Sequence, residues 1–528
     1  MTNKEHESII KEAKEADFCI VGAGPAGSIL AKELSEAGYL VVVLEAGPLM
    51  DPQSEWVSDE LEMNKQLAWT DLRLIEGKDP IKMGHNNSGR GVGGGTNHFS
   101  AVSLRFHPSD FKVKSNEGVA EDWPIDYEDL EPYYSKVERE IGVSGPKYFP
   151  WEPFHGPYPL PERNPLNAVA EVFRLGCERL AIRSSPAPLA ILSAPYNDRP
   201  PCTNRGFCNQ GCIPNAKYSA LITHARWAAD AGADIRPNCM ASRVIVSKGR
   251  ASGVEYFHQG QEYFLKAKVV ILSASVVETP RLLFNSSTAQ FPDGLANNSG
   301  MVGKNLMPHS SHDVYARFNK EIRPYKGTPV MALTMDFYET DPKNGFARGF
   351  IINSHGFRPV SFVSQIAGHY LIYGEELRNL TLDYNYYSRI TLIGEVLPDV
   401  KNCVTLDGNL KDQYGLPVPR ISFSYGPNDL AIIDKGIEKC KDIMEAADGR
   451  VEYVVADTAH LMGTCRMGND PQNSVVNEFC RSHDIPNLFI CDTSVFVTST
   501  PANPTLTLMA IAQRTADYIK RAAAAREI

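Results

Sequence analysis

The chain has 528 residues, 43% of them hydrophobic and 22% charged, with a formal net charge of −10. This length allows two or more domains, and the composition is typical of a soluble globular protein. The negative charge without a basic stripe argues against nucleic-acid binding, and the absence of any run of eighteen apolar residues argues against a transmembrane helix.

Cellular location is predicted from the N-terminus and the cysteines. The first residues contain no apolar core of the kind found in a Sec signal. Eleven cysteines without regular overall spacing favour a reducing cytosol over a secreted disulfide framework. We therefore expect a cytoplasmic protein. The alternative is export or membrane association through a partner subunit that carries the signal.

The first predicted unit is a strand, a tight turn, a helix and a second strand. Its patterns cover residues 18–21, 25–37 and 39–44, and the turn has the GxGxxG spacing. Gly22 allows the turn, Gly24 lets the backbone approach a pyrophosphate, and Gly27 lets helix and strand pack closely. The helix N-terminus offers free N–H groups to phosphates.

An acidic residue narrows the choice of dinucleotide. Glu45 stands at the end of the second strand, where a carboxylate can accept hydrogen bonds from ribose hydroxyls. The same charge disfavours a 2′-phosphate, so FAD or NAD fits better than NADP.

A second glycine-rich loop points to the flavin. Residues 89–111 read GRGVGGGTNHFSAVSLRFHPSDF, and the glycines at 91 and 93–95 leave room for a flat ligand. Here the sequence resembles the glucose–methanol–choline (GMC) flavin oxidoreductases. The resemblance recurs in order at residues 121–140, 269–287, 298–309, 459–479 and 487–519. It implies FAD as the cofactor and makes NAD a poor alternative.

The resemblance also implies an α/β fold (α+β overall), with a Rossmann-like FAD-binding domain and a substrate domain that contains an antiparallel β-sheet. We expect a discontinuous FAD-binding domain of residues 1–140, 200–311 and 451–528, and a substrate-binding domain of residues 141–199 and 312–450. Alternating short strands in the latter region support the antiparallel sheet. Three tyrosines there either line the pocket or pack within strands: Tyr384, Tyr386 and Tyr387.

Cofactor-binding residues follow from the same resemblance. The ADP half is expected at Gly22, Gly24, Gly27 and Glu45, with the adenine near Val244. The pyrophosphate and isoalloxazine are expected along Gly94, Thr96 and Asn97, and the ribityl chain and ring beneath Asp492 and the turn that contains Asn503 and Thr505. At His98 two alternatives are open, a covalent link to the flavin or a hydrogen bond alone.

A catalytic pair is expected near the C-terminus. Oxidation of an alcohol by a flavin needs a base for the hydroxyl proton, and neutral imidazole suits that role. The resemblance assigns the base to His460 and its partner to Asn503, 43 residues later. The amide of Asn503 can bind and orient the substrate oxygen but cannot act as a base.

Three cysteines stand close together in the sequence, at Cys202, Cys208 and Cys212. Zinc is disfavoured because no fourth ligand is paired with them, and a disulfide is disfavoured in a reducing cytosol. The spacing resembles the cysteine ligands in flavin subunits of bacterial sugar and sugar-acid dehydrogenases, which implies a [3Fe-4S] cluster. Against it, other branches of the family carry a similar stretch, so a cluster and a buried turn are both open.

The expected function is oxidation of a CH–OH group of a sugar, sugar acid, polyol or glycoside to a carbonyl, by hydride transfer to FAD. Two alternatives are a flavin-containing lyase or isomerase without net redox turnover, and a flavin electron-transfer subunit. The expected partners are a small-molecule alcohol or sugar and, as implied by the resemblance, a small subunit and a cytochrome electron acceptor. The choice between oxidase and dehydrogenase is open.

Overall fold

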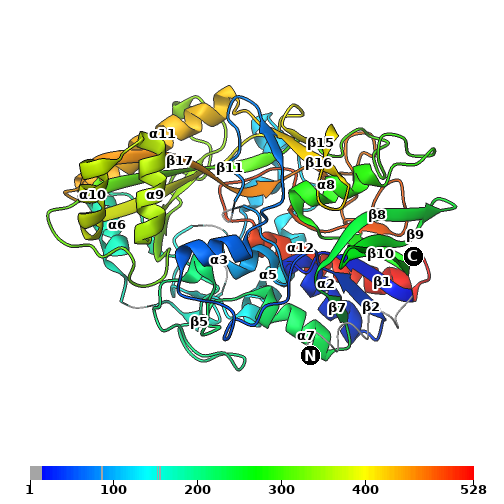
Figure 1. The fold of residues 1–528 in the computed structure, drawn as a ribbon. Helices are drawn as coiled ribbons and strands as arrows, with labels where there is room; N and C mark the ends of the chain where they lie inside the picture. Colours follow the sequence, from blue (N-terminus) through cyan, green and yellow to red (C-terminus); the bar gives the residue numbers. More distant parts are fainter. Residues whose placement is uncertain (1–14, 85–86, 152, 154–155, 164) are drawn as a thin grey trace.

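The computed structural model describes residues 15–528, apart from 85–86, 152, 154–155 and 164 (Figure 1). The expectation that the chain lacks a Sec signal concerns residues 1–14 above all, and these lie outside the described residues. Two large sheets occupy opposite sides of the molecule in Figure 1.

The first sheet is the predicted dinucleotide fold. Its strand order is β7-β2-β1-β10-β9-β8, and β18 also pairs with β10. The strands are β1 (Glu15–Val21), β2 (Val41–Leu44), β7 (Asp234–Arg236), β8 (Cys239–Ser247), β9 (Arg250–His258), β10 (Gln261–Leu272) and β18 (Leu488–Ile490). The pairs that join β7, β2, β1, β10 and β18 are parallel, and those that join β10, β9 and β8 are antiparallel. The strand–helix–strand unit predicted at residues 18–44 is confirmed, with α2 (Pro25–Glu36) between β1 and β2.

The second sheet is antiparallel, as predicted. Its order is β17-β11-β14-β13-β12-β6. The strands are β6 (Ser185–Pro186), β11 (Met307–Arg317), β12 (Ala332–Thr334), β13 (Phe350–Ser354), β14 (Tyr387–Gly394) and β17 (Arg450–Met462). The predicted boundary at residue 451 falls inside β17, so the exact division of the chain into two domains remains a prediction.

Helices cover both sheets, and short strands connect them. The other helices are α3 (Glu60–Leu67), α4 (Val113–Glu117), α5 (Tyr127–Ile141), α6 (Ala168–Arg179), α7 (His224–Asp230), α8 (Ser275–Asn285), α9 (Pro359–Tyr370), α10 (Gly374–Leu382), α11 (Pro427–Ala446) and α12 (Thr505–Ala524). A three-stranded sheet contains β3 (Leu74–Glu76), β15 (Cys403–Lys411) and β16 (Pro417–Ser422), and β4 (Ser144–Gly145) pairs with β5 (Leu160–Pro161). Helix α2 packs against α7 and α12 beside the first sheet.

Alternation along the strands gives the second sheet two different faces. Val314, Ile352 and Leu392 belong to an apolar core with α6 and α11. Their neighbours Asp313 and Thr391 point the other way and line a cavity. Because side chains alternate across a strand, burying the apolar set on the helices leaves the polar set on the opposite face.

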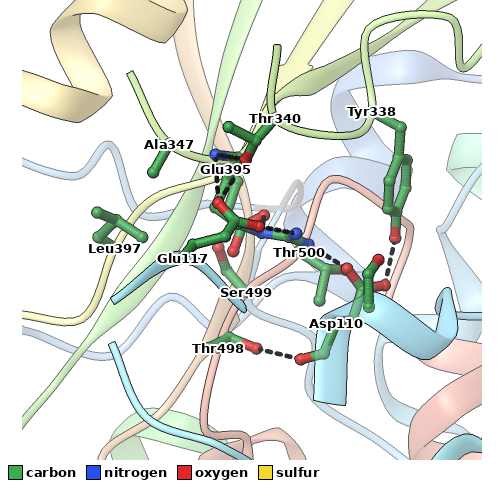
Figure 2. A network of polar contacts seen from close by, with 12 residues as sticks. Asp110, Glu117, Tyr338, Thr340, Ala347, Glu395, Leu397, Thr498, Ser499 and Thr500 are labelled. Atoms are coloured by element: carbon green, nitrogen blue, oxygen red, sulfur yellow. Dashed lines mark hydrogen bonds and ion pairs between the residues drawn. The ribbon is translucent and has the colours of Figure 1, made fainter. Parts of the chain in front are cut away.

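A buried ionic network joins the two halves of the molecule behind that cavity (Figure 2). The guanidinium of Arg348, in the substrate half, contacts Asp110 and donates to Glu117 Oε1 at 2.9 Å and to Glu395 Oε2 at 3.0 Å. Asp110 also accepts from Tyr338 Oη at 2.6 Å. Burial raises the pKa of Glu395 to about 7, which reduces the charge of three carboxylates around one cation. Figure 2 shows this network beside the loop of residues 498–500.

Candidate active site

One cavity of about 710 Å³ extends from the first sheet to the second. On one side it is lined by the glycine turn after β1, the loop of residues 89–100 and the ends of β2 and β10. On the other it is lined by β11, β13, β14, β17 and α9. The predicted cofactor and substrate regions therefore share a single space.

The glycine turn has the geometry that a dinucleotide requires. Gly22 has a φ of +102°, and a Cβ there would lie 2.3 Å from the carbonyl oxygen of Ser273. A Cβ at Gly27 would lie 2.0 Å from the carbonyl oxygen of Gly22, so only glycine allows this packing of helix on strand. Gly24 faces open space and lines the cavity. The first intrahelical hydrogen bond is donated by Ser28, which leaves the earlier N–H groups of α2 without an acceptor in the helix.

Glu45 lies where the sequence places it, but its carboxylate is already well bound. It accepts hydrogen bonds from the backbone N–H groups of Ala23 at 2.9 Å, Gly47 at 2.8 Å and Gly91 at 3.1 Å. A carboxylate has about four acceptor positions, so one is left for a ribose hydroxyl. Glu45 thus orders three loops around the cavity as well as lining it.

The second glycine loop packs directly on the first. A Cβ at Gly94 would lie 3.0 Å from the Cα of Gly24, and Gly95 faces open space. Thr96 and His98 line the cavity as predicted. Asn97 does not: its amide donates to the carbonyl of Val92 at 2.9 Å and its Oδ1 accepts from Ser219 Oγ. The side chain of Asn97 thus holds the loop together, and the position of this residue along the flavin stays a prediction.

Of the remaining cofactor residues, Asp492 and Thr505 line the cavity and Val244 does not. Val244 is buried in the core of β8, and its strand reaches the cavity at Met240 and Ala241. Cys239 of the same strand also lies at the described cavity wall, and the contact of Val244 with the adenine stays a prediction. The carboxylate of Asp492 accepts from Ser275 N, Thr279 Oγ1 and Ser494 N at 3.0, 2.6 and 2.8 Å, and burial raises its pKa.

The open space at Gly24 and Gly95, the free N–H groups of α2 and the acidic residue at the end of β2 fit FAD. A buried lysine supports the loop from behind. Lys217 Nζ donates to the carbonyls of Thr96 at 2.6 Å and Asn97 at 3.3 Å, and burial lowers its pKa to about 8. The sequence analysis missed this residue, whose only local signal is that a lysine follows the cysteine-rich segment.

His460 and Asn503 meet at the cavity wall, as predicted. Asn503 Nδ2 lies 3.3 Å from His460 Nε2, and both residues line the cavity. A β-bulge places the histidine: between the pairs Met307–Met462 and His309–Ala459, β17 has two residues where β11 has one. His460 has a φ of +52° in this bulge, a conformation that non-glycine residues adopt mainly under constraint.

A second histidine, which the sequence analysis did not single out, determines the tautomer of the first. His309 Nε2 contacts the carbonyl oxygens of Ser499, at 3.1 Å, and Thr500, and its Nδ1 lies 2.9 Å from His460 Nδ1. Carbonyl oxygens only accept, so the His309 proton is on Nε2 and its Nδ1 is an acceptor. His460 then donates from Nδ1, and its Nε2 lone pair faces Asn503 and the cavity.

Both imidazoles are neutral in this arrangement. Burial lowers the pKa of His309 to about 4. Burial, followed by repulsion from His309, lowers the pKa of His460 to about 3. Among the described residues, Asn503 Oδ1 has no hydrogen-bond partner, so the amide has an acceptor in addition to its N–H groups for a ligand. Together they form a base and an oriented amide at one point of the cavity.

The structure does not support the predicted iron–sulfur ligands. Cys202, Cys208 and Cys212 are free thiols, and no group of three or more His, Cys, Asp or Glu side chains among the described residues could hold a metal ion. Cys212 Sγ accepts from the N–H of Lys217 at 3.4 Å, so the segment leads into the lysine that supports the glycine loop.

The three tyrosines of the substrate half pack within the protein. Tyr384, Tyr386 and Tyr387 are absent from the cavity wall as the structure describes it. Tyr384 and Tyr387 lie in an aromatic cluster with Phe362. Only Tyr387 packs from a strand, β14, because Tyr384 and Tyr386 belong to a short 3₁₀ helix, Tyr384–Tyr386.

None of the helices in the described part of the chain combines the length and the apolar character that a membrane span requires.

Comparison with known proteins gives two family-model matches, both described as GMC oxidoreductase. The N-terminal model matches residues 17–311 and the C-terminal model matches residues 398–512.

Curated relatives match over nearly the whole chain. A 2-methyl-1,2-propanediol dehydrogenase of Mycolicibacterium austroafricanum is 33% identical, with 96% of each chain covered. A fructose dehydrogenase large subunit of Gluconobacter japonicus is 30% identical, covering 96% of this chain and 98% of its own. A gluconate 2-dehydrogenase flavoprotein of Pantoea cypripedii is 28% identical, and the match covers 98% of this chain and 95% of the relative. Among solved structures, formate oxidase of Aspergillus oryzae has the same fold, with a TM-score of 0.72 at 17% identity over 96% of this chain and 98% of its own.

Proposed function

The chain belongs to the GMC oxidoreductase family, and from that membership we propose that it oxidises a CH–OH group of a sugar, sugar acid, polyol or glycoside to a carbonyl, with His460 as the base. The relatives named above for a diol, a sugar and a sugar acid support the substrate class. FAD, when bound, supplies the hydride acceptor that the oxidation needs.

The observation that carries the proposal is the hydrogen-bonded series Thr500, His309, His460 and Asn503. In this series the lone pair of His460 Nε2 lies at the wall of the cavity, and the dinucleotide turn lines the same cavity. A neutral imidazole in hydrogen-bond reach of a substrate hydroxyl is the geometry of a general base.

The protein groups act on the substrate as follows. The hydroxyl of the substrate replaces the contact between Asn503 and His460, donates to His460 Nε2 and accepts from Asn503 Nδ2. His460 removes the hydroxyl proton as the C–H bond breaks. The imidazolium that forms keeps its Nδ1–H bond to His309, whose own proton is held by the carbonyls of Ser499 and Thr500. Orientation and proton removal thus depend on His309 and His460 of the second sheet, on Asn503 and on the 498–500 loop.

Anaerobic flavin reduction tests the proposal. An alcohol of the right class should bleach the flavin absorbance of the wild-type holoenzyme, and His460→Ala should retain FAD but fail to bleach. Normal bleaching in His460→Ala would refute the role of His460. Absence of bleaching with every alcohol tried would favour the two alternative functions, a lyase or isomerase and an electron-transfer subunit.

The proposal extends to His98 and to the electron acceptor. His98 lines the cavity next to the glycine loop, and we infer that it is the attachment point of a covalent flavin link. The name of the Gluconobacter relative, a large subunit, supports a smaller partner subunit for this chain. A cytochrome as the electron acceptor is part of our proposal. An iron–sulfur cluster is not part of the proposal, because the thiols of the 202–212 segment do not form a ligand set.

A further inference from the structure

A row of polar side chains crosses the second sheet on its cavity face, away from the catalytic pair. Asp313 on β11 pairs with Thr391 on β14, and Thr391 pairs with Asn353 on β13. His355 follows β13, and its Nδ1 lies 3.2 Å from Thr391 Oγ1. All four residues line the cavity. Side chains of paired residues share a face, so the sheet register brings these groups together.

The charge of Asp313 is compensated within the protein. Its Oδ2 accepts from Arg389 Nη1 at 2.8 Å and from Gln365 Nε2 at 3.2 Å, and its Oδ1 accepts from Thr391 Oγ1 at 2.6 Å. These partners oppose the effect of burial and lower the pKa of Asp313 overall, so the carboxylate is ionised. Arg389 also donates to the carbonyl of Gly356. The pair is therefore neutral, and its guanidinium is fully used.

The ionised carboxylate determines which atoms of the row can accept. Because Asp313 only accepts, the single hydroxyl proton of Thr391 is used in that bond. Thr391 Oγ1 must then accept from His355, which places the His355 proton on Nδ1. Burial lowers the pKa of His355 to about 3, so its Nε2 is an unprotonated acceptor.

Two acceptors of the row have no partner. Among the residues that the structure describes, neither His355 Nε2 nor Asn353 Oδ1 has a hydrogen bond, although both atoms are buried. Asn353 as a whole is 3% exposed. A buried acceptor without a donor is unfavourable, so a cavity whose wall contains two such side chains is adapted to a ligand with donors.

We propose that Asn353 and His355 form a second subsite, which binds a hydroxyl group of the substrate remote from the carbon that is oxidised. The inference rests on the function proposed above and specifies its substrate as a polyhydroxylated molecule. His309 and Asp313 lie four positions apart on β11, which is about 13 Å of extended strand. The remote hydroxyl therefore belongs to the far end of the substrate.

Binding can be measured without turnover in the His460→Ala holoenzyme. The probes are primary alkanols and the matching α,ω-diols with six, eight and ten carbons, which differ only in the remote hydroxyl. Dissociation constants come from calorimetric titration. At the length that reaches the row, the diol should bind about 10-fold or more tightly than the alkanol.

Two substitutions in the same background should abolish this preference, namely Asn353→Leu and His355→Phe. Asn353 Oδ1 has no hydrogen bond to lose among the described residues, so leucine removes this free acceptor together with the amide N–H groups. The matched control is His312→Phe, a buried histidine of the same sheet that is absent from the described cavity wall. It should leave the preference unchanged.

The inference is overturned if no diol of the series binds more tightly than its alkanol, or if Asn353→Leu and His355→Phe both keep the preference. Flavin bleaching in the wild-type holoenzyme is read separately. A diol preference without bleaching would refute the proposed function and leave the subsite intact. Bleaching without a diol preference would refute the subsite and leave the proposed function intact.

Discussion

The Nδ1 atoms of His309 and His460 lie 2.9 Å apart, although the two residues are 151 positions apart in the sequence. A hydrogen bond between these two nitrogens requires that one of them carries a proton and that the other does not. The carbonyls of Ser499 and Thr500 settle which one, since they bind the only proton of His309 at Nε2. His309 is thus a positioning residue for His460.

Replacement of His309 should slow flavin reduction without loss of FAD. In His309→Phe the Nδ1–H of His460 has no acceptor, and the ring can rotate or change tautomer. We expect the limiting rate constant of anaerobic flavin reduction to fall by about 100-fold, with the substrate dissociation constant changed far less. His309→Gln, whose amide oxygen can accept from His460, should recover part of the rate. Equal rates for His309→Phe and wild type would contradict the positioning role.

The pH dependence of flavin reduction should be flat in the acid range. His460 acts as a base only when unprotonated, and burial together with His309 lowers its pKa to about 3. The fraction of active base is therefore nearly constant from pH 5 upward. Stopped-flow reduction between pH 5 and 8 should show no inflection near 6.5, the ordinary pKa of histidine. An inflection there, absent in a control with a pH-independent ligand, would show that the resting His460 is protonated.

Protein stability should fall as the pH rises through the range of Glu395. Its pKa is raised by burial to about 7, so between pH 4.5 and 7 the folded state binds more protons than the unfolded state. The free energy of unfolding then decreases with rising pH, by up to about 3 kcal/mol from this group. Glu395→Gln should flatten that part of the profile in denaturant unfolding at pH 5 and 8. The exposed Glu375→Gln serves as the control and should keep the wild-type slope.

Loss of Arg348 should destabilise the protein strongly. Arg348 is fully buried between Asp110, Glu117 and Glu395, and its removal leaves their charges uncompensated (Figure 2). Breaking a buried ion pair in this way costs about 3–5 kcal/mol, so Arg348→Met should lower the midpoint of chemical unfolding accordingly. Arg174→Met removes an exposed pair on α6 and should cost about 0.5 kcal/mol or less. Similar costs for both variants would show that the network contributes little.

The covalent link is tested by acid precipitation. If His98 is the attachment point, the denatured wild-type pellet should retain the flavin absorbance, and the His98→Ala pellet should be colourless with the flavin in the supernatant. Thr96→Ser, a change of the neighbouring cavity residue, controls for altered FAD binding. Flavin in the supernatant of the wild type would refute the link.

Local sequence determined the parts of this protein that depend on local constraints. The GxGxxG turn requires glycine at two of its three positions, since a Cβ at Gly22 or Gly27 would overlap backbone atoms, whereas Gly24 faces open space. Alternation predicted the antiparallel sheet, because one face of it must cover a core. The resemblance pointed to His460 and Asn503, whose segments carry the most specific motifs and whose side chains the structure brings together.

Tertiary structure alone decided how these parts meet. The bulge in β17 turns His460 toward His309, and a one-residue register shift of this kind has no signature in residue type. Tertiary structure also decided which residues of β8 and of the second glycine loop line the cavity, among them Met240, Ala241 and Thr96. The row of Asp313, Thr391, Asn353 and His355 exists only because three strands pair in one register. Proton positions along it follow from hydrogen bonds between residues that the sequence keeps far apart.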